Sequence, residues 1–121
     1  MAQFLQWNCR GLFPRFNDLK CLHDKYKPIC VCLQELILIG KKTFISEFHP
    51  PLLSAQRGDN DRGGAGIHIH KSITFTNINM QTRLHAVAAR LHLERHLTVC
   101  SLYLAPSYPS RNTDVPAEVA I

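Results

Sequence analysis

The stretch Ile29-Cys30-Val31-Cys32-Leu33-Gln34-Glu35 decides the fold. Its first five residues are apolar without alternation, which is typical of a strand buried on both faces. The strand ends on a carboxylate, and α/β proteins place ligands at the carboxyl ends of parallel strands. Glu35 is therefore the first candidate functional residue, with a solvated loop carboxylate as the simpler alternative for this stretch taken alone.

A second strand comes earlier, from Phe4 to Trp7, and it is followed by the polar triplet Asn8-Cys9-Arg10. Between the two strands, residues Arg15 to Tyr26 place apolar side chains three or four positions apart, which predicts an amphipathic helix. Pro28 ends that helix. A strand, helix, strand unit with a crossover of this length makes the two strands parallel and the connection right-handed. We therefore expect Asn8 and Glu35 to point into one cleft.

Further strand patterns follow in the second half of the chain. Residues Ile67–His70 and Ile73–Thr76 alternate strictly, which predicts two half-buried antiparallel strands joined by a turn at Lys71-Ser72. Residues Ala86–Leu93 and Leu97–Leu104 are predicted to form a hairpin. The remaining predicted segments are a short helix at Thr43–Phe48, a brief strand at Leu52–Ala55, a loop at Gln56–Gly66 and a proline-rich loop at Pro106–Pro116.

Charge and composition narrow the functional classes. With 121 residues and 45% hydrophobic composition, the chain amounts to one domain with a modest core. Its formal net charge of +5 favours an anionic partner such as nucleic acid. No apolar run approaches the roughly 18 residues that span a bilayer, and no signal peptide precedes the first strand, so we expect an intracellular protein without a membrane partner. The five cysteines, an odd number lying mostly in apolar segments, indicate reduced thiols.

Three short motifs do not meet the requirements of the binding sites that they suggest. Gly63-Gly64-Ala65-Gly66 lacks the glycine spacing of a dinucleotide-binding turn, and it leads into alternating residues rather than a helix. Cys30 with Cys32, and His68 with His70, each share a strand face, but neither pair has the spacing of a zinc finger or ribbon. Buried thiols and surface imidazoles are the simpler interpretation.

Four motifs in order carry a family resemblance. They are Gln6-Trp7-Asn8-Cys9-Arg10-Gly11-Leu12, Cys32-Leu33-Gln34-Glu35, Arg62-Gly63-Gly64-Ala65-Gly66-Ile67 and Val99-Cys100-Ser101-Leu102-Tyr103-Leu104-Ala105-Pro106. Together they resemble the opening half of the endonuclease/exonuclease/phosphatase superfamily. Within it, the pattern is most similar to the apurinic-type endonuclease domain at the amino end of non-LTR retrotransposon proteins, the jockey-like group especially.

The resemblance implies a mixed α/β fold, part of a four-layered sandwich of two mixed β-sheets flanked by helices. It implies a Mg²⁺ (or Mn²⁺) cofactor with Glu35 as a metal ligand, Asn8 beside the metal and the scissile phosphate, and Tyr103 near the phosphate as the third catalytic residue. These residue types suit the chemistry. Magnesium takes hard oxygen ligands and keeps waters, an amide orients a phosphate without adding negative charge, and a phenol can donate to a phosphate oxygen.

The chain also departs from the pattern of this family. Relatives continue with a strand ending in Asp-x-Asn and a later Ser-Asp-His segment, whereas the only Asp after Tyr103 is Asp114, and no His follows His96. We therefore expect residues 1–121 to be a single partial domain without its second half, a fragment of a DNA endonuclease that is inactive as given. The alternatives are a catalytically dead, basic nucleic-acid-binding remnant and a phosphatase-type relative.

The resemblance also suggests partners and a location. DNA is the expected substrate, and the remainder of the same domain or a reverse transcriptase on a longer chain would be further partners, in the nucleus if the protein belongs to an active element. Arg10, Arg57, Arg62 and Lys71 lie in predicted loops or at strand ends. We expect some of them at the rim of the cleft, where they would give salt-sensitive, sequence-tolerant DNA binding. The alternative is that they only solvate loops.

Overall fold

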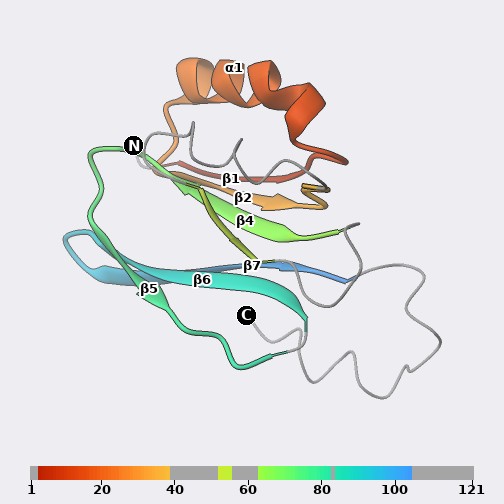
Figure 1. Cartoon of the computed structure of the whole chain (residues 1–121). Helices are drawn as coiled ribbons and strands as arrows, with labels where there is room; N and C mark the ends of the chain where they lie inside the picture. The colour runs from red at the N-terminus through yellow and green to blue at the C-terminus, as the bar shows by residue number, and fades with distance from the viewer. Residues whose placement is uncertain (1–2, 39–51, 56–62, 83, 105–121) are drawn as a thin grey trace.

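The computed structural model describes residues 3–38, 52–55, 63–82 and 84–104. In this part of the chain, two β-sheets stack face to face, and one helix covers the outer face of the first sheet (Figure 1). The prediction of a mixed α/β fold with two sheets is confirmed. Three layers are present in these residues, and the second sheet is purely antiparallel rather than mixed.

The first sheet has four strands in the order β1-β2-β4-β3. Strands β1 and β2 are parallel, as predicted, and their register places Asn8 beside Gln34. Strand β4 runs antiparallel to both β2 and β3. The strands of this sheet are β1 (Phe4–Asn8), β2 (Cys30–Gln34), β3 (Leu53–Ala55) and β4 (Ala65–Ile69).

The crossover between β1 and β2 is a 3-10 turn, η1 (Phe13–Arg15), that leads directly into α1 (Phe16–Tyr26). Pro14 lies in η1, where its fixed φ and missing N–H are tolerated. The helix ends at Lys27, which adopts a left-handed conformation. Its apolar side chains pack on a core made by Cys9, Leu12, Leu19, Val31, Leu33, Leu36, Leu38 and Leu52. The predicted amphipathic helix is therefore confirmed.

The second sheet contains the predicted hairpin. Strands β6 (His85–His92) and β7 (His96–Tyr103) pair antiparallel, and β5 (Phe75–Ile78) pairs with the other side of β6. Strand β7 packs over β2 and β4, while β6 packs over β4 and β3. The core between the sheets is formed by Cys30, Ala65, Ile67, Ile69, Val87, Ala89 and Leu91.

The predicted hairpin across Lys71-Ser72 is wrong. Strand β4 belongs to the first sheet and β5 to the second, so the turn between them connects two layers. Strand β4 is also buried along its whole length instead of half-buried, and it begins at Ala65, inside the predicted loop. The buried polar position is His68, whose Nδ1 lies 2.8 Å from Nε2 of His23 on α1. An imidazole with a hydrogen-bond partner can be buried, so the alternation does not mark an exposed face.

Three other predictions concern the cysteines, membrane spans and segments outside the described residues. All five cysteines are free, and Cys9 and Cys30 are buried, as expected for reduced thiols. In the described ranges, no helix is long and apolar enough to cross a membrane. The predicted helix at Thr43–Phe48 and the loop at Pro106–Pro116 lie outside the described residues, and so does most of the loop at Gln56–Gly66.

Candidate functional site

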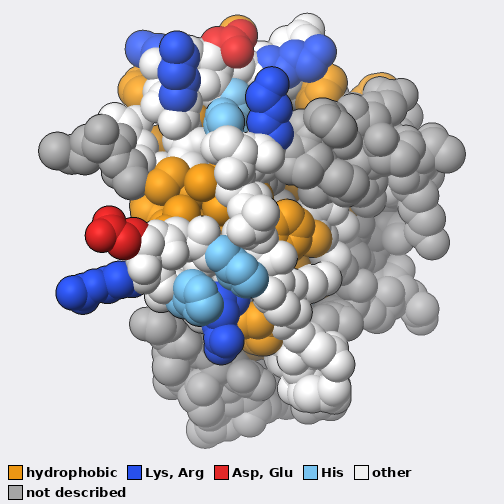
Figure 2. Space-filling model, turned by 90° about the vertical axis from the view of Figure 1, so that its left-hand side faces the viewer, with side chains coloured by type: hydrophobic (Ala, Val, Ile, Leu, Met, Phe, Trp, Pro, Cys, Tyr) orange, Lys and Arg blue, Asp and Glu red, His pale blue; other side chains and the backbone are white. Residues whose placement is uncertain are grey.

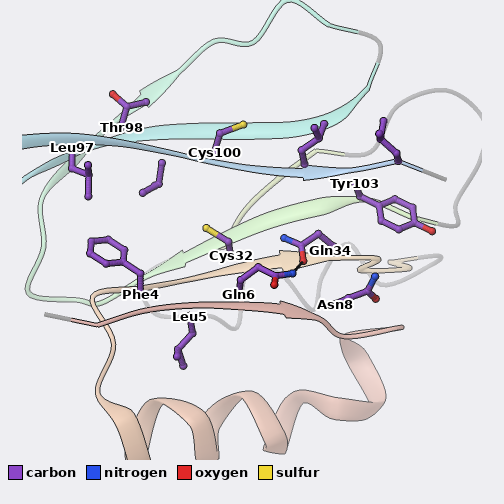
Figure 3. A pocket seen from close by; sticks show the side chains of 13 residues that line it. Phe4, Leu5, Gln6, Asn8, Cys32, Gln34, Leu97, Thr98, Cys100 and Tyr103 are labelled. Atoms are coloured by element: carbon purple, nitrogen blue, oxygen red, sulfur yellow. Dashed lines mark hydrogen bonds between the residues drawn. The ribbon is translucent and has the colours of Figure 1, made fainter. Parts of the chain in front are cut away.

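A cleft of about 670 Å³ follows β1 and β7 on one side of the sandwich. Figure 3 shows Phe4 and Leu97 near one end of it and Asn8 and Tyr103 near the other. The cleft is lined by Phe4, Leu5, Gln6, Asn8, Cys32, Gln34, Leu97, Thr98, Val99, Cys100, Leu102, Tyr103 and Leu104. None of these lining side chains carries a formal charge, so a charge in this region has to come from a neighbouring residue.

Glu35 lies directly after β2, at the same end of the first sheet as Asn8. Its backbone is held on two sides, because its N–H donates to the carbonyl of Gly64 at 2.8 Å and its carbonyl accepts from Gly11 N–H at 2.8 Å. Its φ of 60° is a left-handed value that is uncommon for a residue with a side chain. Such conformations occur where the surroundings over-determine the backbone, as these two hydrogen bonds do.

Cys9, the residue after β1, links the ends of β1 and β2 next to Glu35. Its backbone N–H donates to the carbonyl of Gln34 at 3.0 Å, and its thiol lies 3.4 Å from the same oxygen. Burial raises the pKa of the Cys9 thiol to about 11. The thiol is therefore protonated at neutral pH and acts as a weak donor to the backbone.

Tyr103 connects the Glu35 carboxylate to the cleft. Tyr103 lines the cleft together with Asn8, and the Glu35 carboxylate lies close enough to act on its phenol. Burial raises the pKa of the Tyr103 phenol, and the nearby Glu35 carboxylate raises it further through its charge and its capacity to accept a hydrogen bond. The structure thus brings the three predicted residues to one end of the sandwich. Asn8 and Tyr103 line the cleft, whereas Glu35 is not among the lining residues, contrary to the expectation that it points into the same cleft as Asn8.

The turn at Gly63-Gly64 explains how Tyr103 is held, and it brings in His85, which the sequence analysis did not select. A Cβ on Gly63 would lie 2.8 Å from Cε2 of Tyr103 and 3.1 Å from Cε1 of His85. His85 accepts a hydrogen bond from Gly64 N–H through Nδ1, at 2.7 Å, and lies opposite Tyr103 in the β6–β7 register. The sequence does contain a signal for His85. If the turn of the predicted hairpin is placed at residues 93–95, the register pairs His85 with Tyr103.

A chain of polar side chains inside the sandwich was also missed. Gln6 donates to the side-chain oxygen of Gln34, Gln34 donates to the Ser101 hydroxyl at 3.0 Å, and Ser101 donates to the carbonyl of Leu33 at 2.7 Å. Ser101 and Gln34 are buried, so these bonds satisfy groups that water does not reach. This series of hydrogen bonds joins β1, β2 and β7. It therefore fixes β7, which carries Tyr103, relative to β2, which precedes Glu35.

The four predicted nucleic-acid-binding residues do not share one position. Arg10 is exposed just beyond β1, at the Glu35 end of the sheet. Lys71 is exposed beyond the far end of β4, where Ile69 pairs with Cys30, so about 16 Å of strand separates it from that end. Lys71 therefore lies away from the Glu35 end, because β4 runs away from this end. The expectation that some of the four residues lie at the rim of the cleft stays a prediction. Arg57 and Arg62 lie outside the described residues.

Other positive side chains of the described part gather elsewhere. Figure 2 shows the end of the molecule opposite Glu35, with Lys and Arg side chains concentrated over the α1 region at the top. Exposed lysines on and just after this helix are Lys20, Lys25 and Lys27. The charge of the chain is therefore not focused on the cleft within the described residues.

We expect the pKa of the Tyr103 phenol to depend on the charge of Glu35. In Glu35→Gln the negative charge disappears, so the pKa of the Tyr103 phenol should fall toward its ordinary value, while burial keeps it above that value. NMR titration of the labelled ring measures the pKa of Tyr103 separately from those of the other tyrosines. Glu94→Gln, a change of an exposed turn carboxylate, is the matched control and should leave the titration of Tyr103 unchanged.

Comparisons with known proteins do not add to this picture. No protein-family model matches the chain, and no curated protein matches it significantly. In the described residues, no group of three or more His, Cys, Asp or Glu side chains is arranged to hold a metal ion. The resemblance and its metal site therefore stay predictions.

Proposed function

We propose that this chain carries half of the active site of a metal-dependent DNA endonuclease of the retrotransposon type. The observation that supports the proposal best is geometric: Asn8 and Tyr103 line the same end of the cleft, and Glu35 follows β2 at that end, near enough to influence the Tyr103 phenol. A carboxylate and an amide at the carboxyl ends of two parallel strands, with a phenol from the second sheet beside them, are suited to holding a metal ion and a phosphate group bound to it.

In this proposal Glu35 and Asn8 supply the oxygen ligands for Mg²⁺ or Mn²⁺. One carboxylate and one amide oxygen fit such an ion only as a partial set, since Mg²⁺ completes its shell with waters and substrate phosphate oxygens. When bound, the ion supplies stabilisation of the negative charge that develops on the phosphate oxygens. Asn8 orients the phosphate without adding charge.

Tyr103 has two partners in this scheme. Its raised pKa keeps the phenol protonated at neutral pH, so it always has a hydrogen to donate. Without ligand the hydroxyl donates to Glu35. When a phosphate enters the cleft and the Glu35 oxygens are engaged elsewhere, the same hydroxyl is free to donate to a phosphate oxygen.

We expect the chain alone not to nick DNA at a useful rate. Among the described residues next to Glu35, none is assigned to activating the nucleophile or protonating the leaving group. General acid–base assistance is typically worth about 10² to 10⁴ in rate, and leaving-group stabilisation adds to this. A phosphatase-type relative would share Glu35, Asn8 and Tyr103, so cleavage of a phosphate monoester is the matching assay for that alternative.

The test is Mn²⁺ binding followed by paramagnetic broadening of the Asn8 side-chain amide and the Tyr103 ring signals. Both signals should broaden, and a short DNA duplex should strengthen the effect by adding phosphate ligands. Glu35→Gln should weaken binding at least about tenfold, in line with the loss of one charged ligand. Glu94→Gln should bind as the parent chain does. Broadening that persists in Glu35→Gln, or plasmid nicking that disappears in Glu35→Ala, would each contradict part of this assignment.

A further inference from the structure

In the described part of the chain, two strand edges without a partner strand run along the same cleft. Among the described strands, β1 is the outer strand of the first sheet and β7 is an outer strand of the second. Sheet edges in soluble proteins are usually protected by charged residues, prolines or bulges, because an open edge pairs readily with another chain. Neither β1 (Phe4–Asn8) nor β7 (His96–Tyr103) contains Lys, Arg, Asp, Glu or Pro.

The two edges are offset from each other. Strand β7 packs over β2 and β4 rather than over β1. The cleft-facing side chains of β1 are consequently uncovered, and Phe4 is 42% exposed. Leu97, at the start of β7, is 41% exposed. Since neighbouring strands lie about 4.8 Å apart, the cleft has the form of a slot that one further strand on β7 would fill.

We propose that a second copy of this chain fills the slot. A two-fold axis lying between the two sheets and along the strands would place β1 of each copy against the open edge of β7 of the other. Both slots of the dimer are then filled by the same operation, as an isologous interface requires. The observations behind this inference do not use the proposed nuclease function, but the partner's β1 would occupy the cleft that Asn8 and Tyr103 line, so dimerisation and phosphate binding there would compete.

The strand directions fit this arrangement. In Figure 3, Phe4 lies near Leu97 and Asn8 lies near Tyr103, so β1 and β7 run the same way. Rotation about an axis along the strands preserves that direction, so the incoming β1 would pair parallel with β7. The pairing requires this offset of one strand. In each copy, β1 lies beyond the open edge of β7, and no described strand of the second sheet lies opposite β1. The Phe4 side chains of the two copies would face each other near the axis.

The distribution of charge also favours the slot over other surfaces of the protein as the dimer interface. The chain has a formal net charge of +5, and exposed lysines gather on α1, so most approaches of two copies bring like charges together. The residues lining the cleft are uncharged. Two copies can therefore meet along the slot without burying a charge or opposing like charges.

The test is the molar mass of the full chain, measured by sedimentation over a wide concentration range. We expect a dimer for the parent chain and a monomer for Phe4→Lys, which would place two positive charges opposite each other at the axis. Because Phe4 is already exposed in the single chain, the variant should keep its circular dichroism spectrum. Phe13→Lys is the matched control: Phe13 is 45% exposed on η1, away from the slot, and this variant should stay dimeric.

A charge swap sharpens the test. Phe4→Glu alone should be monomeric, and an equimolar mixture of Phe4→Lys with Phe4→Glu should restore a dimer, because the charges facing each other are then opposite. A parent chain that is monomeric at every concentration would overturn the proposal, as would a dimer that Phe4→Lys leaves intact. A monomer whose β7 amides are nevertheless protected from hydrogen exchange would overturn it in favour of an edge covered by the same chain.

Discussion

Replacing Gly63 with alanine is expected to lower the free energy of unfolding by about 2–4 kcal/mol. Two separate costs add at this position. Gly63 has a φ of +87°, which strains any residue with a side chain, and the new Cβ would lie 2.8 Å from Cε2 of Tyr103. Relief of that contact moves the Tyr103 ring, so the pKa of its phenol should also fall as the phenol becomes less buried and moves away from the Glu35 carboxylate.

Gly11→Ala separates the two costs. Gly11 has a φ of +100°, so the backbone strain is similar, but its Cβ would meet nothing closer than Arg15 Nη1 at 3.8 Å. We expect this variant to lose only about 1–2 kcal/mol, the cost of the left-handed conformation. Urea denaturation of both variants measures the difference. Equal losses would mean that the Gly63 contact with Tyr103 is not a tight one.

Ser101→Ala should destabilise the protein by about 1–3 kcal/mol, the usual cost of leaving a buried polar group without its partner. Ser101 is 1% exposed, and its hydroxyl accepts from the Gln34 amide and donates to the Leu33 carbonyl. Removing it leaves both groups without this partner between the sheets. Equilibrium urea denaturation gives the change in unfolding free energy.

Thr98→Ala is the control for Ser101→Ala on the same strand. Thr98 is exposed, so the loss of its hydroxyl should stay within about 0.5 kcal/mol. The two variants should also differ in their effect on Tyr103, because the hydrogen bonds of Ser101 position β7 relative to β2. The pKa of Tyr103 should change in Ser101→Ala and stay constant in Thr98→Ala. A Ser101 variant as stable as the Thr98 variant would show that water replaces the lost hydroxyl.

The local elements, and the two strand ends that carry Asn8 and Glu35, could be predicted from the amino-acid sequence alone. The helix and the β6–β7 hairpin follow from apolar periodicity and from short connections. The parallel pairing of β1 and β2 follows from the crossover helix between them. These features depend on residues close together in the chain, for which the spacing of apolar side chains and the turn residues are sufficient.

Only the tertiary structure decided which elements share a sheet and which distant side chains meet. Alternation predicts a strand but not its partner, so β4 and β5 were assigned to one hairpin although they belong to different layers. The contact between Tyr103 and Glu35, and the link from Gln34 to Ser101, depend on how the second sheet stacks on the first. That stacking is set by the fit of two apolar faces, and no periodicity within a single strand specifies where one face lies on the other.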